Sequence, residues 1–186
     1  MLKYTIGFIR QTDRVLLLNR EKPSWMGCWN GVGGKLEPGE TPRNSMLREM
    51  REETGLSFAG IGVEFKGVVT WTVEGKFVGG MYVFKAELSP DARYETPKKT
   101  DEGILDWKTV PWTLHPENRG VAQTIPQSIE AILDDPRCYE HRCYFENNRM
   151  ARYERREIPP DVERIEDGHA LQEALAGGFL RKGSSI

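Results

Sequence analysis

Short apolar runs, rich in β-branched residues and bounded by turn residues, recur along most of the chain. Two of these runs flank Gln11, Thr12 and Asp13, and this arrangement predicts an opening hairpin. Two more lie on either side of a predicted turn at Glu74 and Gly75. A last pair, joined at residues 146–148, predicts a closing hairpin. The predicted strands are residues 3–10, 14–20, 62–73, 76–88, 104–110, 138–145 and 149–158.

Two segments show the spacing of amphipathic helices. One begins at Thr41 and ends before Gly55, and the other covers residues 124–135. Residues 90–102 are polar and contain proline, which predicts a loop. Strands surrounding one early helix and one late helix predict a layered α/β domain.

The chain is expected to divide near Pro159 and Pro160, where the composition changes. Its 186 residues are the size of one domain with a real core. Residues 1–157 are predicted to form that domain. Residues 158–186 are predicted to form a C-terminal extension, peripheral or mobile, with one short helical pattern at residues 170–176.

The overall charge of −2 gives the chain no general attraction to a nucleic acid polymer or to an anionic membrane. No apolar run approaches the roughly 20 residues that cross a bilayer, and the first residues lack the pattern of a signal peptide. Cys28, Cys138 and Cys143 have no zinc-type spacing and are typical of small half-buried residues in a reducing compartment. We therefore expect a cytoplasmic protein whose ligand is bound at a local site.

The predicted early helix has strong signals at both ends. Thr41 supplies a hydroxyl N-cap and Pro42 suits the first helical position. Gly55 suits the left-handed conformation just beyond a helix end. Met46, Leu47 and Met50 share one side of this helix and are expected to bury against a sheet.

Glu49, Glu52 and Glu53 fall within one arc of roughly 100° beside that apolar side. They lie in the last two turns, where the helix dipole disfavours negative charge. A hard divalent cation such as Mg²⁺ prefers oxygen ligands and would relieve the repulsion. The spacing by itself is equally typical of a solvated acidic face, because repulsion at this spacing costs only about 0.2–0.5 kcal/mol.

A longer motif changes that balance. It consists of Gly34, five residues, Glu40, seven residues, and then the run Arg48, Glu49, Met50, Arg51, Glu52, Glu53, Thr54, Gly55 and Leu56. These residues at this spacing resemble the signature of the Nudix hydrolases. The resemblance implies the Nudix fold, an α/β/α sandwich with a mixed sheet. It also implies hydrolysis of a nucleoside diphosphate linked to a further group.

By matched position, the resemblance implies that Glu49, Glu52 and Glu53 bind Mg²⁺, for which Mn²⁺ is a possible substitute. The backbone carbonyl of Gly33 would join them, and Glu102 would add a further carboxylate. Glu49 or Glu102 would accept the proton of the attacking water, and the sequence does not choose between them. Arg48 is placed among the catalytic residues and would, with Glu40, hold the glycine loop against the helix.

The run PSWMGCWNGVGGK is similar to the MutT-type hydrolases of oxidised purine nucleotides. That match implies that Asn30 hydrogen-bonds the base or sugar, although Asn30 also suits a turn with Gly31. Lys35 is predicted to contact substrate. Asn118 lies where this group reads the base, with a cap or turn role as the alternative.

The predicted function is therefore hydrolysis of an oxidised purine nucleoside triphosphate to a nucleoside monophosphate and pyrophosphate. ADP-ribose or a dinucleotide polyphosphate is an alternative substrate, and the first is weakened because residues 56–88 contain no proline. A nucleotide-sensing module without catalysis is a further alternative, weakened because every carboxylate of the motif is present. A nucleotide is the expected partner, and a homodimer is a possible assembly.

Overall fold

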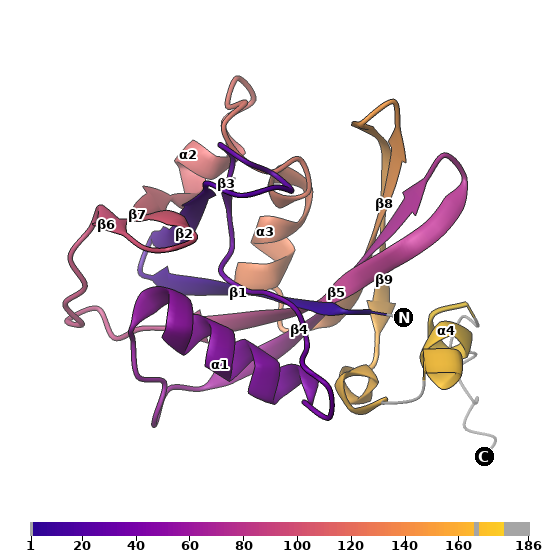
Figure 1. Ribbon diagram of the computed structural model, residues 1–186, viewed down its shortest axis with the longest axis horizontal. Coiled ribbons are helices and arrows are strands. Elements are labelled where there is room, and N and C mark those ends of the chain that lie inside the picture. The colour runs from indigo at the N-terminus through magenta and orange to yellow at the C-terminus, as the bar shows by residue number, and fades with distance from the viewer. Residues whose placement is uncertain (1, 166–167, 177–186) are drawn as a thin grey trace, which may run out of the picture.

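The computed structural model describes residues 2–165 and 168–176. Within these residues, nine strands form one sheet, and four α-helices and one 3₁₀ helix accompany it (Figure 1). The strands are β1 Tyr4–Gln11, β2 Arg14–Arg20, β3 Trp29–Asn30, β4 Val63–Val73, β5 Lys76–Glu87, β6 Lys98–Lys99, β7 Gly103–Thr109, β8 Cys138–Glu146 and β9 Arg149–Ile158. The helices are α1 Pro42–Thr54, α2 Val110–Leu114, α3 Ile125–Asp134, η1 Pro160–Arg164 and α4 Gly168–Ala176.

The sheet is mixed. Its order is β6-β7-β2-β1-β5-β4-β8-β9, with β3 paired to β2 away from this path. β1 runs parallel to β5 and β4 runs parallel to β8, whereas the other neighbours are antiparallel. The seven predicted strands and the predicted hairpins are present. The short strands β3 and β6 and the one-turn helix α2 were not predicted, because segments of two to five residues carry no hydrophobic period.

Alternate residues of the central strands serve two separate cores. On β2, Leu16 and Leu18 face one core with Met46 of α1, whereas Val15 and Leu17 face another with Ile129 of α3. Figure 1 shows α1 and α3 on opposite sides of the sheet. The arrangement is the predicted α/β/α sandwich.

The turns use residues that tolerate a positive φ. Asn147 and Asn148 join β8 to β9 with φ of 50° and 61°, the conformation of a two-residue hairpin turn. Glu74 and Gly75 join β4 to β5 with φ of 48° and 75°. Both turns stand at the positions that the sequence predicts.

The described part of the C-terminal extension contacts the first core. Val162 of η1 and Leu171 and Leu175 of α4 are buried in the cluster that contains Met46. The predicted helical pattern at residues 170–176 lies within α4. The division of the chain into a domain of residues 1–157 and an extension stays a prediction.

Within the described residues, no helix is both long enough and apolar enough to cross a membrane.

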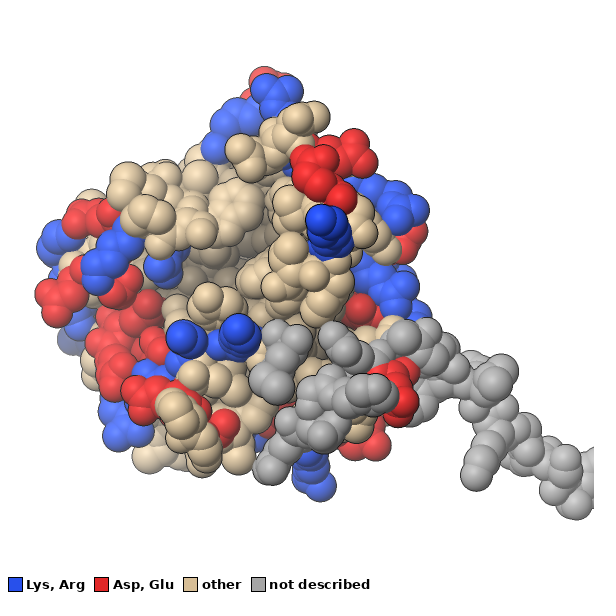
Figure 2. Space-filling view, turned by 45° about the vertical axis from the view of Figure 1, so that its right-hand side comes forward, with Lys and Arg blue, Asp and Glu red and all other residues tan. Residues whose placement is uncertain are grey.

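Figure 2 shows a hollow with largely uncharged walls at the centre of one face, and acidic side chains gathered below it and to its left.

Candidate active site

Helix α1 begins and ends where the sequence predicts. The hydroxyl of Thr41 accepts a hydrogen bond from the Asn44 amide at 3.2 Å. Gly55 has φ 75°, and its amide donates to the Arg51 carbonyl at 2.8 Å. The last helical carbonyl, that of Thr54, accepts from the Tyr94 hydroxyl at 2.7 Å and the Lys98 ammonium at 2.8 Å. These contacts fix the turn that carries the last two glutamates.

The apolar side of α1 packs closely on β1. Met46 and Met50 are fully buried, and Leu47 is partly buried against the same core. Gly7 of β1 allows this approach, because a side chain there would stand 2.2 Å from the terminal carbon of Met50. The helix therefore has one rotational setting, and its acidic edge faces the glycine loop before it.

The three glutamates of that edge have different surroundings. Glu53 is buried, with 8% of its surface exposed, and accepts a hydrogen bond from the Gly33 amide at 2.7 Å. Burial, opposed in part by that hydrogen bond, raises the pKa of Glu53 to about 8. Burial also raises the pKa of Glu49, although Arg48 opposes the change. Glu52 is the most accessible, with 60% of its side chain exposed.

Gly34 leaves room for the Glu49 carboxylate against the backbone. A side-chain carbon at position 34 would lie 2.3 Å from Glu49 Oε1. The Gly34 carbonyl accepts from the Thr5 amide at 2.8 Å, which holds this part of the loop on β1. The Glu49 carboxylate thus occupies space that any side chain at position 34 would fill.

Arg48 joins the loop to the helix, as the motif predicts. Its Nε and Nη2 donate to the two oxygens of Glu40 at 3.0 and 2.9 Å. Its Nη2 also donates to the Lys35 carbonyl at 3.2 Å. Its Nη1 donates to Glu49 at 2.9 Å and to Glu52 at 3.2 Å. Through its hydrogen bonds, Arg48 lowers the pKa of Glu40.

Glu102 comes to the same region from the loop between β6 and β7. It precedes β7, and its carboxylate accepts from Lys22 at 2.5 Å and lies 3.7 Å from Arg20. The Glu102 carbonyl accepts from the Glu21 amide at 2.9 Å, which ties the two loops together.

One cleft brings these acidic residues together. It has a volume of about 380 Å³ and is lined by Arg20, Gly33, Gly34, Glu49, Glu52, Glu53, Thr100, Asp101 and Glu102. Gly33, Glu49, Glu52, Glu53 and Glu102, which the family resemblance implies as metal ligands, all line it. Within the described ranges, no three acidic, histidine or cysteine side chains are grouped closely enough to hold a metal ion. Arg48 contacts Glu49 and Glu52, and Lys22 contacts Glu102.

The donor set of this cleft fits a hard divalent cation. Its carboxylates supply the oxygen ligands that such a cation prefers, and the seat beside Gly34 holds one of them against the backbone. Glu53 is buried beside like charge, so a cation would offset an unfavourable burial.

A family model described as the NUDIX domain matches residues 3–127. This chain belongs to the Nudix family. Its α/β fold agrees with a solved structure of the MutT protein of Bacillus halodurans, with a TM-score of 0.65 and 26% identity, covering 83% of this chain and 97% of that one.

Two curated relatives are each 32% identical to this Nudix protein. One is an uncharacterised Nudix hydrolase, YvcI, of Bacillus subtilis, aligned over 103 residues, which are 55% of this chain and 62% of the relative. The other is the oxidised purine nucleoside triphosphate hydrolase of Mus musculus, aligned over 105 residues, which are 56% of this chain and 64% of the relative. The chain thus spans somewhat less than two thirds of the length of these relatives.

A second cleft of the Nudix domain adjoins the acidic one at Gly33 and Gly34, which line both. It is lined by Tyr4, Thr5, Ile6, Arg20, Pro23, Ser24, Trp25, Asn30, Gly31, Gly33, Gly34, Lys35, Trp71 and Met81. Asn30 is buried, and its Oδ1 accepts from the Gly31 amide at 2.9 Å. Asn30 therefore makes the turn contact with Gly31 and lines this cleft, and its hydrogen bond to a base or sugar stays a prediction.

The structure places the remaining predicted residues of the Nudix site as follows. Lys35 lines the Asn30 cleft. Asn118 donates to the Trp112 carbonyl and accepts from the Gly120 amide, both at 2.9 Å. These contacts give Asn118 a turn role, and contact with substrate stays a prediction.

The sequence did not indicate that Arg20 and Lys22 contact Glu102, or that Trp25 and Trp71 line the cleft of Asn30. Their positions depend on how β2, β4 and the loop before β3 meet in space. The spacing of Arg20 and Lys22 along the sequence does not indicate that they contact Glu102.

Proposed function

We propose that this Nudix protein hydrolyses a nucleoside triphosphate to a nucleoside monophosphate and pyrophosphate with Mg²⁺, and that its substrates are oxidised purine nucleotides. One observation carries the proposal: the cleft of Glu49, Glu52, Glu53 and Glu102 opens at Gly33 and Gly34 onto a cleft lined by Asn30 and two tryptophans. Phosphates and a purine therefore have adjoining places of suitable chemistry.

The metal would be held by Glu49, Glu52, Glu53, Glu102 and the Gly33 carbonyl, with Mn²⁺ as a substitute for Mg²⁺. When bound, it supplies neutralisation of the phosphoryl charge and a more acidic water. It would compete with Arg48 for Glu49 and Glu52 and with Lys22 for Glu102. Both basic side chains would then be free to face the substrate phosphates.

The proton of the attacking water would pass to Glu49 or Glu102. Glu49 lies beside Gly34, and burial raises the pKa of its carboxyl, which favours proton uptake. Glu102 sits on a loop that Lys22 and Arg20 hold. Arg48 would keep the loop and helix in register while the proton moves.

The purine preference rests on the cleft of Asn30. Trp25 and Trp71 offer ring faces for stacking a base, and an asparagine amide offers both a donor and an acceptor to a purine edge. The name of the mouse relative, an oxidised purine nucleoside triphosphate hydrolase, supports the same substrate class.

Glu53→Gln tests the metal site. Glutamine keeps the size of the side chain and can still accept from the Gly33 amide, but it removes the charge. We expect Mg²⁺-dependent pyrophosphate release to fall by at least about 10²-fold, as for the loss of one preorganised electrostatic group, with circular dichroism unchanged. Glu64→Gln, at an exposed position on β4, is the matched control. Activity equal to that control would remove Glu53 from the metal site.

A substrate panel tests the specificity. It contains 8-oxo-dGTP, the ordinary dNTPs, ADP-ribose and a dinucleotide polyphosphate, each with Mg²⁺, and the products are separated by chromatography. We expect the highest kcat/KM on 8-oxo-dGTP, and Asn30→Ala should lower this preference among bases more than it lowers hydrolysis of the least preferred dNTP. Equal losses of kcat/KM on every nucleotide would show that Asn30 only stabilises the turn with Gly31.

Two other functions have defined outcomes in the same panel. Faster turnover of ADP-ribose or of a dinucleotide polyphosphate would assign the site to another nucleoside diphosphate derivative. Binding of nucleotides with no turnover of any of them would assign a sensing role. A homodimer stays a prediction, which sedimentation of the purified chain tests.

A further inference from the structure

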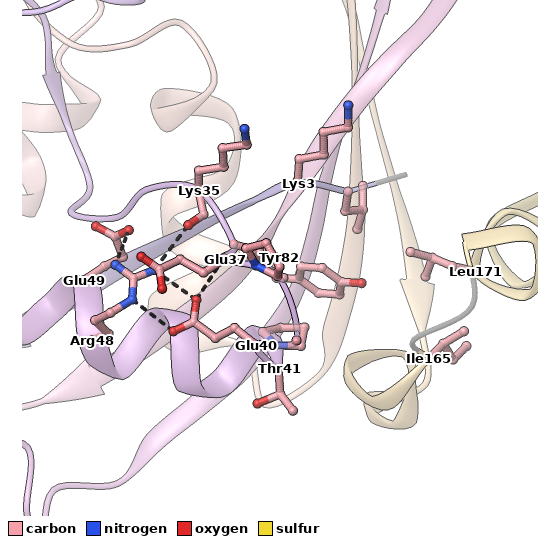
Figure 3. Close-up of a pocket in the computed structure, with 15 residues that line it drawn as sticks. Lys3, Lys35, Glu37, Glu40, Thr41, Arg48, Glu49, Tyr82, Ile165 and Leu171 are labelled. Carbon is pink, nitrogen blue, oxygen red and sulfur yellow. Dashed lines mark hydrogen bonds and ion pairs between the residues drawn. The ribbon is translucent and has the colours of Figure 1, made fainter.

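A third cleft, with a volume of about 940 Å³, lies beside the start of α1, and Figure 3 shows the residues that line it. Glu49 lines both this cleft and the acidic cleft. Lys35 lines both this cleft and the cleft of Asn30. The three clefts therefore meet around residues 33–35. A phosphate chain that begins near Asn30 and passes the acidic cleft at Glu49 brings its last phosphate to the third cleft.

Two lysines are neighbours at this junction because the start of β1 pairs with the loop that follows Gly34. The Leu36 amide donates to the Lys3 carbonyl at 2.9 Å, and Tyr4 forms a β-bridge with Lys35. The Lys3 amide also donates to a carbonyl of β5 at 3.3 Å. All these contacts are made by the backbone, so a substitution of the Lys3 side chain leaves them in place.

The ammonium groups of Lys3 and Lys35 are available to a ligand. Both lysines are exposed, and in the described part of the chain neither side chain has a hydrogen bond or an ion pair. Three glutamates also line the third cleft: Glu37, Glu40 and Glu49. The last two are paired with Arg48. Figure 3 shows both lysine side chains extending away from these carboxylates. An anionic ligand would therefore meet two cations that no described carboxylate pairs with.

Lys3 lines the third cleft and neither of the other two. Arg48 and Lys22, by contrast, contact carboxylates of the acidic cleft, Glu49 and Glu102 among them. In the proposed reaction the metal acts at the bond between the first and second phosphates, so the third phosphate lies farthest along the chain from the base. The position of Lys3 therefore suits the third phosphate, whereas Arg48 and Lys22 suit the phosphates at the metal.

We propose that Lys3 binds the terminal phosphate of a nucleoside triphosphate, with Lys35 beside it, and thereby selects triphosphates over the corresponding diphosphates. The inference rests on the proposed function, because the acidic cleft of that function fixes where the terminal phosphate lies. A terminal phosphate carries the highest charge of the chain, and an ammonium group binds it as a compact point charge. A diphosphate ends at the metal and does not reach Lys3. The terminal phosphate stays in the pyrophosphate product, so hydrolysis itself does not break this contact.

The test measures the ratio of kcat/KM for 8-oxo-dGTP to kcat/KM for 8-oxo-dGDP with Mg²⁺. A general loss of activity lowers both values and does not move this ratio. Lys3→Met keeps most of the length of the side chain and removes its charge. We expect the ratio to fall by about tenfold, as for the loss of one hydrogen bond from a charged group. Lys76→Met, at an exposed position on β5 outside the three clefts, is the matched control and should leave the ratio unchanged.

Binding separates this inference from the proposed function. Calorimetry with the α,β-methylene analogues of GTP and GDP and Mg²⁺ measures the same preference without turnover. Tighter binding of the triphosphate analogue, weakened in Lys3→Met and not in Lys76→Met, supports the role of Lys3 even if no nucleotide is hydrolysed. Equal affinity of the wild type for both analogues overturns the inference, and so does an unchanged preference in Lys3→Met. An equal fall in Lys76→Met also overturns it, because the effect would then belong to the net charge of the chain.

Discussion

Replacing Gly34 by alanine tests whether the seat beside the glycine loop positions the Glu49 carboxylate. The added carbon would lie 2.3 Å from Glu49 Oε1, where ordinary contacts begin at 3.4 Å. The carboxylate must therefore retreat by roughly 1 Å, and a misplacement of this size costs about 10²-fold in rate. Gly34 is not among the glycines with a positive φ, so the alanine backbone itself is unstrained.

The expected result is a fall of about 10²-fold in kcat/KM for pyrophosphate release. The unfolding temperature should change by less than about 4 °C, equivalent to about 1 kcal/mol for a chain of this size. Gly62→Ala is the matched control, because it meets nothing within 4 Å and has no positive φ. Stopped assays with Mg²⁺ and thermal unfolding of each variant supply both numbers.

A double-mutant cycle identifies the route of the effect. If the alanine acts through Glu49, adding Gly34→Ala to Glu49→Ala should cause no further loss, because the displaced group is already absent. A further loss of the same size in the double variant would show that Gly34 acts elsewhere. Wild-type activity in Gly34→Ala would refute the whole reasoning.

Arg48→Lys should lower the free energy of unfolding by about 2 kcal/mol, because lysine cannot donate the two parallel hydrogen bonds that Arg48 makes to Glu40. Urea unfolding measures this change, and an unchanged midpoint would show that the pair does not stabilise the fold. Lys98→Met removes the cation that donates to the Thr54 carbonyl and should lower the free energy of unfolding by about 1 kcal/mol in the same assay. No loss would show that the hydrogen bond from Tyr94 is enough to satisfy this carbonyl. Burial lowers the pKa of His141 to about 4 from an ordinary 6.5, so the unfolded chain takes up the proton first as the pH falls. The contribution of His141 to stability should therefore be nearly constant above about pH 7 and fall by about 3 kcal/mol by pH 4. Glu53 and the other groups titrate in both proteins, so the check is the difference between the free energies of unfolding of wild type and His141→Phe. This difference should change by that amount over that range, and a difference that does not vary with pH would assign the slope to other groups.

Much of the fold follows from local signals. The caps at Thr41 and Gly55 and the turns at residues 74–75 and 147–148 lie where the sequence predicts. These signals are local because one hydroxyl, one proline or one positive φ decides each boundary. The sequence did not predict the short elements β3, β6 and α2, because their positions depend on pairing with distant strands and on packing.

The sequence by itself determined that this helix carries an acidic edge, because helical geometry alone puts Glu49, Glu52 and Glu53 on one side. It did not determine how these carboxylates differ, which depends on what the fold puts beside each of them. Tertiary structure buried Glu53 under the Gly33 amide and left Glu52 accessible. It also brought Glu102 to the same cleft. Burial and contacts between residues far apart in the chain are products of packing, and no local spacing records them.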